Sequence, residues 1–518
     1  MMMQKLFILF LLLATPLYNV KSEEAFYPEP DFFSQDKDYF LHTVEGGQTV
    51  YFISKMYNIS VEAIYQLNPG SEAGIKVGSQ LKIPQESGSY FYHTIQARET
   101  LYSVSRMYQM KGEDILDVNP GLSLETFTTG KIIRIPTNRV TAPMTGPSED
   151  YIQTVTNALL SPSTQTETLE AIQVALLIPF TTGNRMVEYY EGFLLALKEV
   201  KKKGISVTPQ VYDIGSNTAT LSSILQKPSL EKANLIIGGL SDQQIKLIAG
   251  FSSENNIPYV IPFTSKSDEL LAYSNVYQIN TAQSYLYSKA SAAFCNKYKD
   301  SNIIFYIPGT PGNKMDFIKT VQKDLTAKNI SYQVMNNQTL FYSDILPFLD
   351  ANKNNVIIPA DDGSEALSKL ITPLRSVVEL KPQIAVSLFG YPAWQVSGAE
   401  YLNDFFSLNA TFYSIFYADP TSSKFKSFYN NYQRWFSKEM INTYPKYGLL
   451  GYDTGMFFIQ LLHQYGLSYD ANINKLNYSG IQTDFYFERI NNWGGWINTN
   501  LYFVEFKPNA TITSHPVK

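Results

Sequence analysis

Residue types that commonly do chemistry are scarce in this chain. It contains four histidines, His42, His93, His463 and His515, and a single cysteine, Cys295. One cysteine can form neither an intrachain disulfide nor a cysteine-based metal cluster. The sequence has no Gly-X-Ser-X-Gly motif, no His-Glu-X-X-His motif and no phosphate-binding glycine loop. We therefore predict no catalytic residues, no metal site and no cofactor.

Two further sets of residues were candidates for chemistry. Asp361 and Asp362 could in principle form a glycosidase pair, but sequence neighbours rarely converge on one bond. The two carboxyl groups of such a pair must stand roughly 5–9 Å apart across a cleft. His463 lies in an apolar helical pattern and Cys295 follows the apolar stretch 292–294, so we expect both in the core. We predict that the chain is not an enzyme.

The composition excludes some partners. The 518 residues include 41 Lys and Arg against 46 Asp and Glu, which gives a formal net charge of −5. A nucleic-acid-binding protein would need a basic stripe, so this balance argues against nucleic acid as a partner. Hydrophobic residues make up 44% and charged residues 17%, a globular composition. At roughly 150 residues per domain, the length indicates about three or four folded units.

The N-terminus has the pattern of an export signal. Lys5 precedes the apolar run 6–14, which is too short to span a bilayer. Small residues around Ser22 suit a cleavage site, so we predict a signal peptide over 1–22. No cysteine follows the apolar run, so we do not expect a lipoprotein. The expected location is the periplasm or the cell envelope, after export by a cleavable signal peptide.

Residues 42–84 and 93–136 repeat one sequence pattern. The matching positions are His42 and His93, Thr49 and Thr100, Tyr57 and Tyr108, Asn68-Pro69-Gly70 and Asn119-Pro120-Gly121, and Pro84 and Pro136. In the first copy, a strand over 42–44 precedes apolar residues at helical spacing, and a second helix ends at the Asn-Pro step. A strand over 81–83 closes the unit. We therefore predict that each copy folds as βααβ around a small core.

This pattern resembles the LysM domain over nearly the full length of both copies. The resemblance implies binding to glycans built on N-acetylglucosamine, above all peptidoglycan. The family's groove lies between the loop after the first strand and the loop before the last, here 46–50 with 68–75 and 97–101 with 119–127. The implied glycan-binding residues are Gly46, Gly47, Gln48, Thr49, Asn68, Pro69 and Ile75 in the first copy and Glu99, Thr100, Asn119 and Pro120 in the second.

The two copies differ at the turn after the first strand. Where the family usually has Gly-Asp-Thr, the first copy has Gly47-Gln48-Thr49 and the second has Arg98-Glu99-Thr100. A glycine there lets a sugar approach the backbone, so we expect the first copy to matter more for glycan binding. The alternative is that the repeats only pack on a neighbouring domain. A spacer rich in Thr, Ser and Pro is predicted over 138–170.

From residue 172 onward, short apolar runs alternate with helical patterns. Strands are predicted over 174–178, 207–212, 234–237 and 258–261, and in a second series over 302–307, 356–358 and 384–389. Buried parallel strands joined by helical crossovers give doubly wound sheets with helices on both faces. The predicted fold class is α/β, with two small βααβ modules followed by a two-lobe domain. A ligand would bind at the carboxyl ends of the strands.

Residues 171–508 resemble the type I periplasmic-binding-protein fold, in its branched-chain amino-acid-receptor branch. The segments that carry the resemblance are VALLIPF, LIIGGLSD, ENNIPYVIPFTS, NVYQINTAQSY, YGLLGYDTGMFF and the stretch 480–506. The resemblance implies ligand-binding residues Thr181, Thr182, Ser241, Asp242, Thr264 and Ser265 in the first lobe and Asn313, Asp361, Asp362 and Tyr391 in the second. Ser241-Asp242 and Thr264-Ser265 also suit helix caps. Tyr391 stands where the amino-acid receptors have an acidic residue that holds the ligand ammonium group. The alternatives are that Asp361 or Asp362 takes that place, or that the pocket holds a different ligand or none.

The predicted organisation follows from these patterns. It has a signal peptide over 1–22, an N-terminal segment over 23–41, LysM domains over 42–85 and 92–137, a linker over 138–170, and a two-lobe domain over 171–510. Its first lobe takes about 171–281 and 415–480, and its second about 282–414 and 481–510.

Three functions stay open. The first is a peptidoglycan-tethered protein that binds or senses a small solute between its lobes. The second is a peptidoglycan-bound regulator or scaffold of cell-wall synthesis enzymes without a small ligand. The third, a wall hydrolase, is weakest because the sequence has no catalytic constellation. The expected partners are peptidoglycan or another N-acetylglucosamine glycan, with a small-molecule ligand and an envelope protein as the two alternatives for the lobes.

Overall fold

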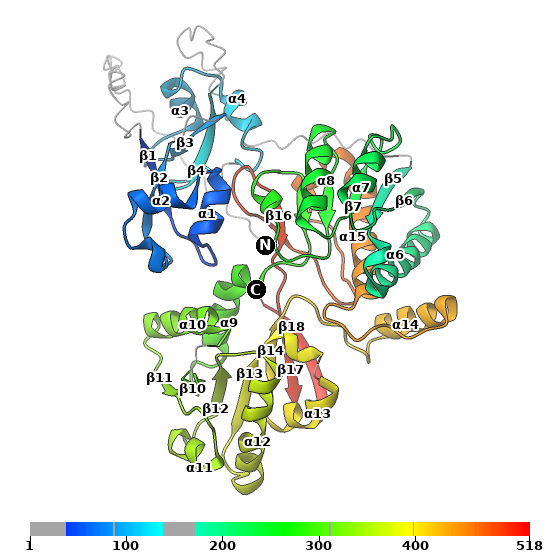
Figure 1. Ribbon diagram of the computed structural model, residues 1–518. Coiled ribbons are helices and arrows are strands. Elements are labelled where there is room, and N and C mark those ends of the chain that lie inside the picture. Colours follow the sequence, from blue (N-terminus) through cyan, green and yellow to red (C-terminus); the bar gives the residue numbers. More distant parts are fainter. Residues whose placement is uncertain are drawn as a thin grey trace, which may run out of the picture.

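The computed structural model shows two small βααβ units followed by two larger α/β lobes (Figure 1). It describes residues 38–85, 89–123, 125–137, 169, 171–309, 312–396 and 398–517. The predicted signal peptide, and the predicted spacer apart from residue 169, lie outside these residues. In the described part of the chain, no helix has the length and apolar character needed to cross a membrane. The predicted α/β fold class is confirmed.

Each LysM domain is a two-stranded antiparallel sheet packed on two helices. In the first, β1 (Tyr39–Thr43) pairs with β2 (Gln80–Pro84), around α1 (Val50–Tyr57) and α2 (Val61–Leu67). In the second, β3 (Tyr90–Thr94) pairs with β4 (Ile132–Pro136), around α3 (Leu101–Met107) and α4 (Gly112–Asp117). The fully buried core residues include Ile53, Ile64 and Ile83 in the first domain and Val104, Ile115 and Ile133 in the second. The predicted βααβ pattern is confirmed.

The first lobe is built on a seven-stranded sheet in the order β15-β16-β9-β8-β7-β5-β6. Its strands are β5 (Ile172–Ile178), β6 (Val207–Asp213), β7 (Leu235–Gly238), β8 (Tyr259–Ile261), β9 (Val276–Gln278), β15 (Phe487–Arg489) and β16 (Trp496–Asn498). All neighbours are parallel except β15 and β16. The helices α6 (Asn184–Lys202), α7 (Thr218–Leu225), α8 (Asp242–Glu254) and α15 (Tyr447–Tyr465) surround this sheet (Figure 1).

The second lobe has its own seven-stranded sheet, in the order β11-β10-β12-β13-β14-β17-β18. Its strands are β10 (Asn302–Tyr306), β11 (Tyr332–Met335), β12 (Asn355–Pro359), β13 (Val386–Gly390), β14 (Thr411–Ser414), β17 (Tyr502–Lys507) and β18 (Thr511–Pro516). The strands from β10 to β14 pair in parallel, whereas β17 pairs antiparallel with both β14 and β18. Its helices are α9 (Tyr287–Lys297), α10 (Met315–Ala327), α11 (Tyr342–Ile345), α12 (Ser364–Leu380) and α13 (Gly398–Ser407). One more helix, α14 (Ser423–Phe436), packs on α6 and extends outward (Figure 1).

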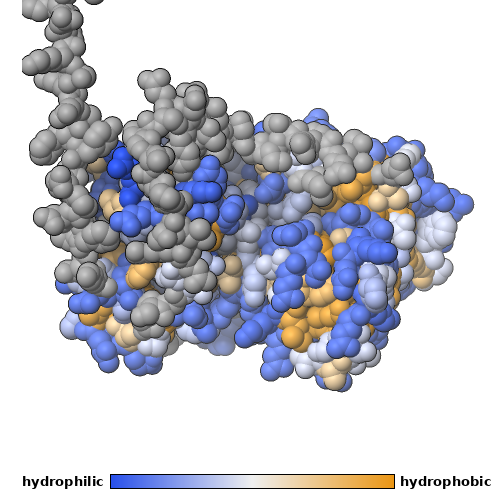
Figure 2. Space-filling view, turned by 90° about the horizontal axis from the view of Figure 1, so that it is seen from above, coloured by the Kyte–Doolittle hydropathy of each residue, from blue (hydrophilic) through white to orange (hydrophobic). Residues whose placement is uncertain are grey.

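Within the described residues, the chain passes between the lobes after β9, after β14 and after β16. The predicted organisation assigns 481–510 to the second lobe, and this is wrong for β15 and β16. These strands belong to the first sheet because β16 pairs in parallel with β9. His463, expected in the core, is exposed near the end of α15, whereas Cys295 is buried as predicted. Seen from above, apolar colour gathers over the first lobe, on an otherwise largely hydrophilic face (Figure 2).

Candidate functional site

The LysM pair, which we define as residues 39–136, is fastened to the first lobe by Trp493. This side chain comes from the loop between β15 and β16 and is 3% exposed. Its ring centroid lies 6.0 Å from that of Tyr57 in the first domain and 5.6 Å from that of Tyr92 in the second. The Arg134 guanidinium stands 4.6 Å from its ring centroid. One buried indole therefore packs on both LysM domains, and such aromatic rings dominate interface energetics.

Polar contacts surround this anchor. The Gly121 N–H donates to the Asn492 carbonyl at 2.8 Å, and Asn492 Nδ2 donates to the Ile132 carbonyl at 2.9 Å. On the first domain, the Tyr51 hydroxyl donates to the Asp268 carboxylate at 3.1 Å. The first lobe thus holds the first LysM domain through Asp268 and the second through Asn492.

The turn at Gly46 and Gly47 in the first LysM domain packs against the segment that leads from the first lobe to the second. A Cβ added at Gly46 would stand 2.7 Å from Ser288 Oγ, and one at Gly47 would stand 2.8 Å from the Ser284 carbonyl oxygen. Gly47 also has a φ of +82°, which favours glycine. Ser284 belongs to η5 (Gln283–Leu286), which follows β9 and leads into α9. The expectation of a turn open to a sugar is therefore not met, because the protein's own backbone occupies that space.

Other predicted glycan residues of the first domain stabilise its fold. Thr49 Oγ1 caps α1 by accepting a backbone N–H at 3.1 Å. Asn68 braces β2, because its side chain donates to the Lys82 carbonyl at 2.7 Å and accepts from the Lys82 N–H at 2.8 Å. Pro69 is exposed, and Ile75 is partly buried against the core of the domain. The loop before the last strand therefore exposes backbone together with the apolar side chains of Pro69 and Val77.

A histidine occupies the same place in both domains, with a different partner in each. His42 Nε2 lies 2.7 Å from Gln48 Oε1, and His93 Nε2 lies 2.7 Å from Glu99 Oε2. Burial lowers the pKa of His42. Burial would raise the pKa of Glu99, but hydrogen bonds from His93 and a backbone N–H hold it below its usual value. Gln48 Nε2 has no hydrogen-bond partner among the described residues.

Of the remaining predicted glycan residues in the second domain, two stabilise its fold and one is exposed. Thr100 caps α3, accepting the Ser103 N–H at 3.1 Å. Asn119 is fully buried and holds β4, with its amide oxygen accepting the Arg134 N–H at 2.8 Å. Pro120 is exposed. The Asn-Pro-Gly step therefore shapes the loop through Asn119 and leaves Pro120 accessible.

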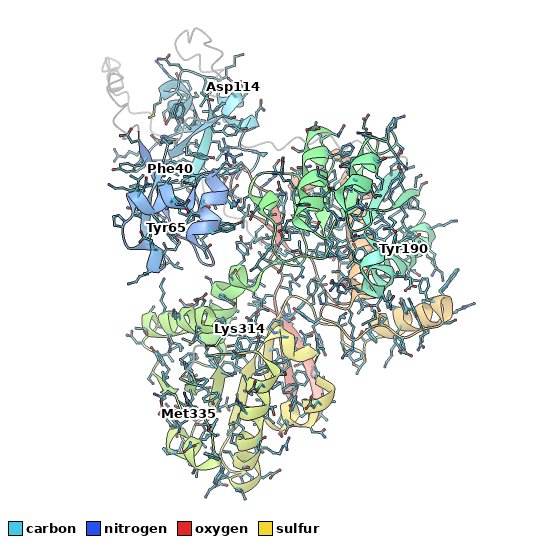
Figure 3. The ribbon with its side chains drawn as sticks, in the orientation of Figure 1. Phe40, Tyr65, Asp114, Tyr190, Lys314 and Met335 are labelled. Atoms are coloured by element: carbon cyan, nitrogen blue, oxygen red, sulfur yellow. The ribbon has the colours of Figure 1, made fainter. Side chains whose placement is uncertain are left out.

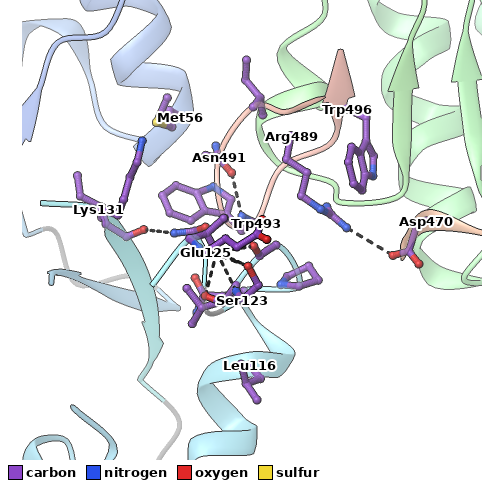
Figure 4. Close-up of a pocket in the computed structure, with 18 of the residues that line it drawn as sticks. Met56, Leu116, Ser123, Glu125, Lys131, Asp470, Arg489, Asn491, Trp493 and Trp496 are labelled. Carbon is purple, nitrogen blue, oxygen red and sulfur yellow. Dashed lines mark hydrogen bonds and ion pairs between the residues drawn. The ribbon is translucent and has the colours of Figure 1, made fainter. Parts of the chain in front are cut away.

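A cavity of about 1310 Å³ lies between the LysM pair and the first lobe (Figure 4). We call it the junction cavity. Its lining includes Glu45 and Gln48 from the first domain, Asn119, Pro120, Ser123, Glu125 and Lys131 from the second, and Asp470, Ala471, Lys475, Arg489, Asn491 and Trp496 from the C-terminal domain. Three residues predicted to bind glycan, Gln48, Asn119 and Pro120, thus meet at one cavity although they belong to different LysM copies.

The predicted ligand loops of the first lobe hydrogen-bond within their own turns. Thr181 and Thr182 are exposed, and the Thr182 hydroxyl donates to a backbone carbonyl at 2.7 Å. Ser241 caps α8 by accepting a backbone N–H at 3.3 Å, beside the exposed Asp242. Thr264 Oγ1 donates to a backbone carbonyl at 3.0 Å. Capping and turn formation therefore account for these three hydroxyl groups in the structure.

The predicted residues of the second lobe form a network of their own. Asn313 Nδ2 donates to Asp362 at 2.8 Å, and Asp361 accepts the Asn313 N–H at 3.3 Å. Lys314, at the end of the second lobe that faces the first, pairs with Asp362 at 2.9 Å (Figure 3). Tyr391 is fully buried, its hydroxyl donates to a backbone carbonyl at 2.5 Å, and burial raises its pKa. In the structure Tyr391 therefore presents no side-chain surface to a ligand.

A small cavity of about 210 Å³ marks the place where the lobes meet. It is lined by Ser265, Asn280, Thr281, Gln283, Leu286, Pro392, Tyr413, Ile415 and Tyr444. Gln283 Oε1 accepts from Tyr413 at 3.0 Å and from Lys314 at 3.0 Å, so it joins the connecting segment to the second lobe. Small-molecule sites usually occupy roughly 300–1,000 Å³, so this cavity is small for a solute. Of the predicted ligand residues, Ser265 lines it.

Sequence reasoning missed two sets of residues that the structure brings together. Gln283 and Tyr413, at the small cavity between the lobes, were not among the predicted ligand residues, although Gln283 lies in the segment NVYQINTAQSY that carries the resemblance. The C-terminal lining of the junction cavity, between 470 and 496, was missed as well. The stretch Asn491-Asn492-Trp493-Gly494-Gly495-Trp496 was the one usable signal, because it places two of the four tryptophans beside two glycines. In the described residues, no group of three or more His, Cys, Asp and Glu side chains could hold a metal ion.

The fold and its sites define an α/β protein in which a pair of LysM domains is docked on a two-lobe domain. Residues 42–84 and 93–136 match the LysM domain family. A Bacillus subtilis protein named as a sporulation-specific glycosylase is 31% identical over 97 residues. That match covers 19% of this chain, and the chain spans 22% of the length of that curated relative.

Solved structures resemble the two-lobe part at low sequence identity. A Rhodospirillum rubrum protein described as a branched-chain amino acid ABC transporter has a TM-score of 0.49 and 12% identity, over 67% of this chain and 99% of that one. An ABC transporter substrate-binding protein from Desulfitobacterium hafniense has a TM-score of 0.41 and 15% identity, with the same two coverages. Haemophilus influenzae LpoA has a TM-score of 0.46 and 13% identity, over 71% of this chain and 65% of that one.

Proposed function

We propose that this chain is a non-enzymatic protein of the cell envelope that binds peptidoglycan through its LysM pair. The observation that carries this proposal is the double match to the LysM family, with an intact βααβ core in each copy. Export by a cleavable signal peptide, without a lipid anchor, belongs to the same proposal. Loop backbone groups can pair with the acetamido groups of the glycan while apolar side chains pack on sugar faces.

Sedimentation with insoluble peptidoglycan tests this proposal on the full chain. We expect the protein to pellet with the glycan and to be released by soluble oligomers of N-acetylglucosamine. Oligomers of glucose of the same length are the matched control, because they lack the acetamido group. A chain that stays in the supernatant, or that both oligomers release equally, would contradict the proposal.

For the two lobes, we propose a scaffold that an envelope protein partner recognises. The small cavity where the lobes meet is below the usual size of a ligand site, Tyr391 is buried, and the carboxylates of Asp361 and Asp362 already have partners within the second lobe. These features support a regulator or scaffold of cell-wall synthesis enzymes that needs no small ligand. Solute binding is the second candidate, favoured by the buried Thr281 Oγ1, which lacks a hydrogen-bond partner at the same cavity.

The two candidates for the lobes differ in a thermal-shift experiment. A solute that binds the folded state raises its melting temperature by mass action. We expect no stabilisation of the full chain by amino acids or by small wall fragments, and capture of a cell-wall synthase by the immobilised chain. Specific stabilisation by one solute, removed by Ser265→Trp, would instead establish the solute-binding candidate.

A further inference from the structure

We propose that the two LysM domains do not bind glycan separately, and that the junction cavity is one composite glycan site completed by the C-terminal domain. This inference rests on the proposed peptidoglycan binding and names where it occurs. The first LysM domain contributes Glu45 and Gln48 from its first loop, and the second contributes Pro120 and Ser123 from its second loop. The first domain thus supplies the loop after its first strand, and the second domain supplies the loop before its last strand. Together they provide both loops of one LysM groove.

The arrangement follows from which loops are already covered. In the first domain, the Gly46-Gly47 part of the groove packs on Ser284 and Ser288, while Gln48 stays half-exposed at the cavity. In the second domain, Gly121 packs on the Asn492 backbone, with the Gly121 N–H donating to it at 2.8 Å. These contacts bring the two half-grooves to one space, and Lys131 bridges them by pairing with Glu45 at 3.0 Å.

The C-terminal wall of the cavity carries hydrogen-bond donors that lack partners. Asn491 Nδ2 and the indole nitrogens of Trp493 and Trp496 are buried and unpaired, and all three residues line the cavity. Buried polar groups nearly always have a partner, so a cluster of unpaired donors needs an explanation. A ligand rich in hydroxyl and carbonyl oxygens would supply the missing acceptors once the lining adjusts around it.

Charge and size narrow the ligand further. The cavity is lined by three acidic and three basic side chains, and two of each are paired, Glu45 with Lys131 and Asp470 with Arg489 at 3.5 Å (Figure 4). This balance suits an uncharged polar ligand. A volume of about 1310 Å³ exceeds the roughly 300–1,000 Å³ of usual small-molecule sites, so it suits an oligomer. The class we assign is an oligosaccharide of N-acetylated hexosamines.

The test adds bulk to the C-terminal wall without touching either LysM domain. Ala471 lines the cavity and is half-buried, so Ala471→Arg fills space that the glycan would use. Asn477→Arg is the matched control, because Asn477 is exposed on the same segment and does not line the cavity. Binding of a soluble tetramer of N-acetylglucosamine to the full chain is measured by calorimetry. We expect Ala471→Arg to lower the affinity at least about tenfold and Asn477→Arg to leave it unchanged.

A second variant tests the chemistry of the wall. Asn491→Asp keeps the side-chain oxygen that accepts the backbone N–H of Trp493 at 2.9 Å, and it removes the unpaired Nδ2 donor. Losing one hydrogen bond of about 1 kcal/mol corresponds to about a fivefold loss of affinity. Melting temperatures are measured alongside, to confirm that each variant is folded.

The outcomes separate this inference from the proposed function. Unchanged affinity in folded Ala471→Arg and Asn491→Asp, in a chain that still pellets with peptidoglycan, would overturn the composite site and leave peptidoglycan binding intact. A wild-type chain that binds neither the tetramer nor peptidoglycan would overturn both.

Discussion

At the scale of single residues, the buried histidine of each LysM domain has a different partner, an amide in the first domain and a carboxylate in the second. The ring of His42 bridges the Tyr57 hydroxyl at 2.8 Å and neutral Gln48 at 2.7 Å, whereas His93 faces the carboxylate of Glu99. Both partners also accept a backbone N–H three residues earlier in the chain, so glutamine and glutamate fit the same geometry. The sequence predicted Gln48 and Glu99 as glycan contacts, but it could not show that each is the partner of a buried histidine.

A pH titration follows from this difference. Burial holds the pKa of His42 below its ordinary value of 6.5, so the unfolded chain takes up a proton that the folded domain resists. His42 therefore favours folding above about pH 6.5, and this contribution is lost as the pH falls towards its folded pKa. Gln48→Glu places a carboxylate on Nε2 and should raise the pKa of His42.

Proton NMR of the imidazole Cε1–H groups measures this shift directly, because the chain has four histidines to assign. The exposed His463 and His515 serve as references within the same sample. A His42 midpoint that Gln48→Glu leaves in place would contradict the assigned partnership.

At the scale of elements, the central feature of the first lobe is the contact between α6 and α15. A Cβ added at Gly192 would stand 1.8 Å from the Gly448 carbonyl oxygen, and one at Gly451 would stand 1.9 Å from that of Tyr189. The two helices therefore touch backbone to backbone. Met186, Tyr189 and Phe193 recur at helical spacing along α6, and all three are fully buried. The start of α15 at Tyr447 is harder to recognise in the sequence, because this helix is apolar on nearly every side and lacks a clear periodicity.

Gly451→Ala tests the close contact. Alanine in a helix interior is normally favoured over glycine by roughly 0.5–1 kcal/mol. Here the added methyl group meets the Tyr189 carbonyl. We expect the cost of overpacking to exceed the gain in helix propensity, so that the variant destabilises the lobe by about 1–3 kcal/mol.

Gly250→Ala in α8 is the matched control, because its Cβ would meet one atom, the Tyr273 hydroxyl, at 4.0 Å. We expect that variant to be neutral or slightly stabilised. Denaturant unfolding measures both variants, and equal midpoints for the two would argue against the backbone contact.

At the scale of the whole molecule, the sequence predicted the parts and missed how they are joined. Local patterns sufficed for the βααβ cores and for most parallel strands, because spacing and apolar runs carry that information. The docking of the LysM pair depends on Trp493 meeting Tyr57 and Tyr92, which are far away in the chain. No local pattern encodes such a contact. Separation along the chain also explains the wrong lobe for β15 and β16, because β16 pairs with β9, which lies more than 200 residues earlier.

Removing the anchor should separate the two parts of the molecule. Trp493→Ala deletes the indole that packs on both LysM domains, and loss of a buried tryptophan typically costs about 3–5 kcal/mol. The remaining contacts are a few hydrogen bonds at Gly121 and Tyr51, worth about 1 kcal/mol each, and the edge contact between the rings of Phe52 and Tyr285. We therefore expect the LysM pair to leave the first lobe, which increases the radius of gyration in small-angle X-ray scattering and weakens binding of the N-acetylglucosamine tetramer. Trp435→Ala, at a tryptophan that is 59% exposed on α14, should change neither quantity. If Trp493→Ala keeps the radius of gyration of the wild type, then the other contacts are sufficient to hold the LysM pair, and the indole is not its anchor.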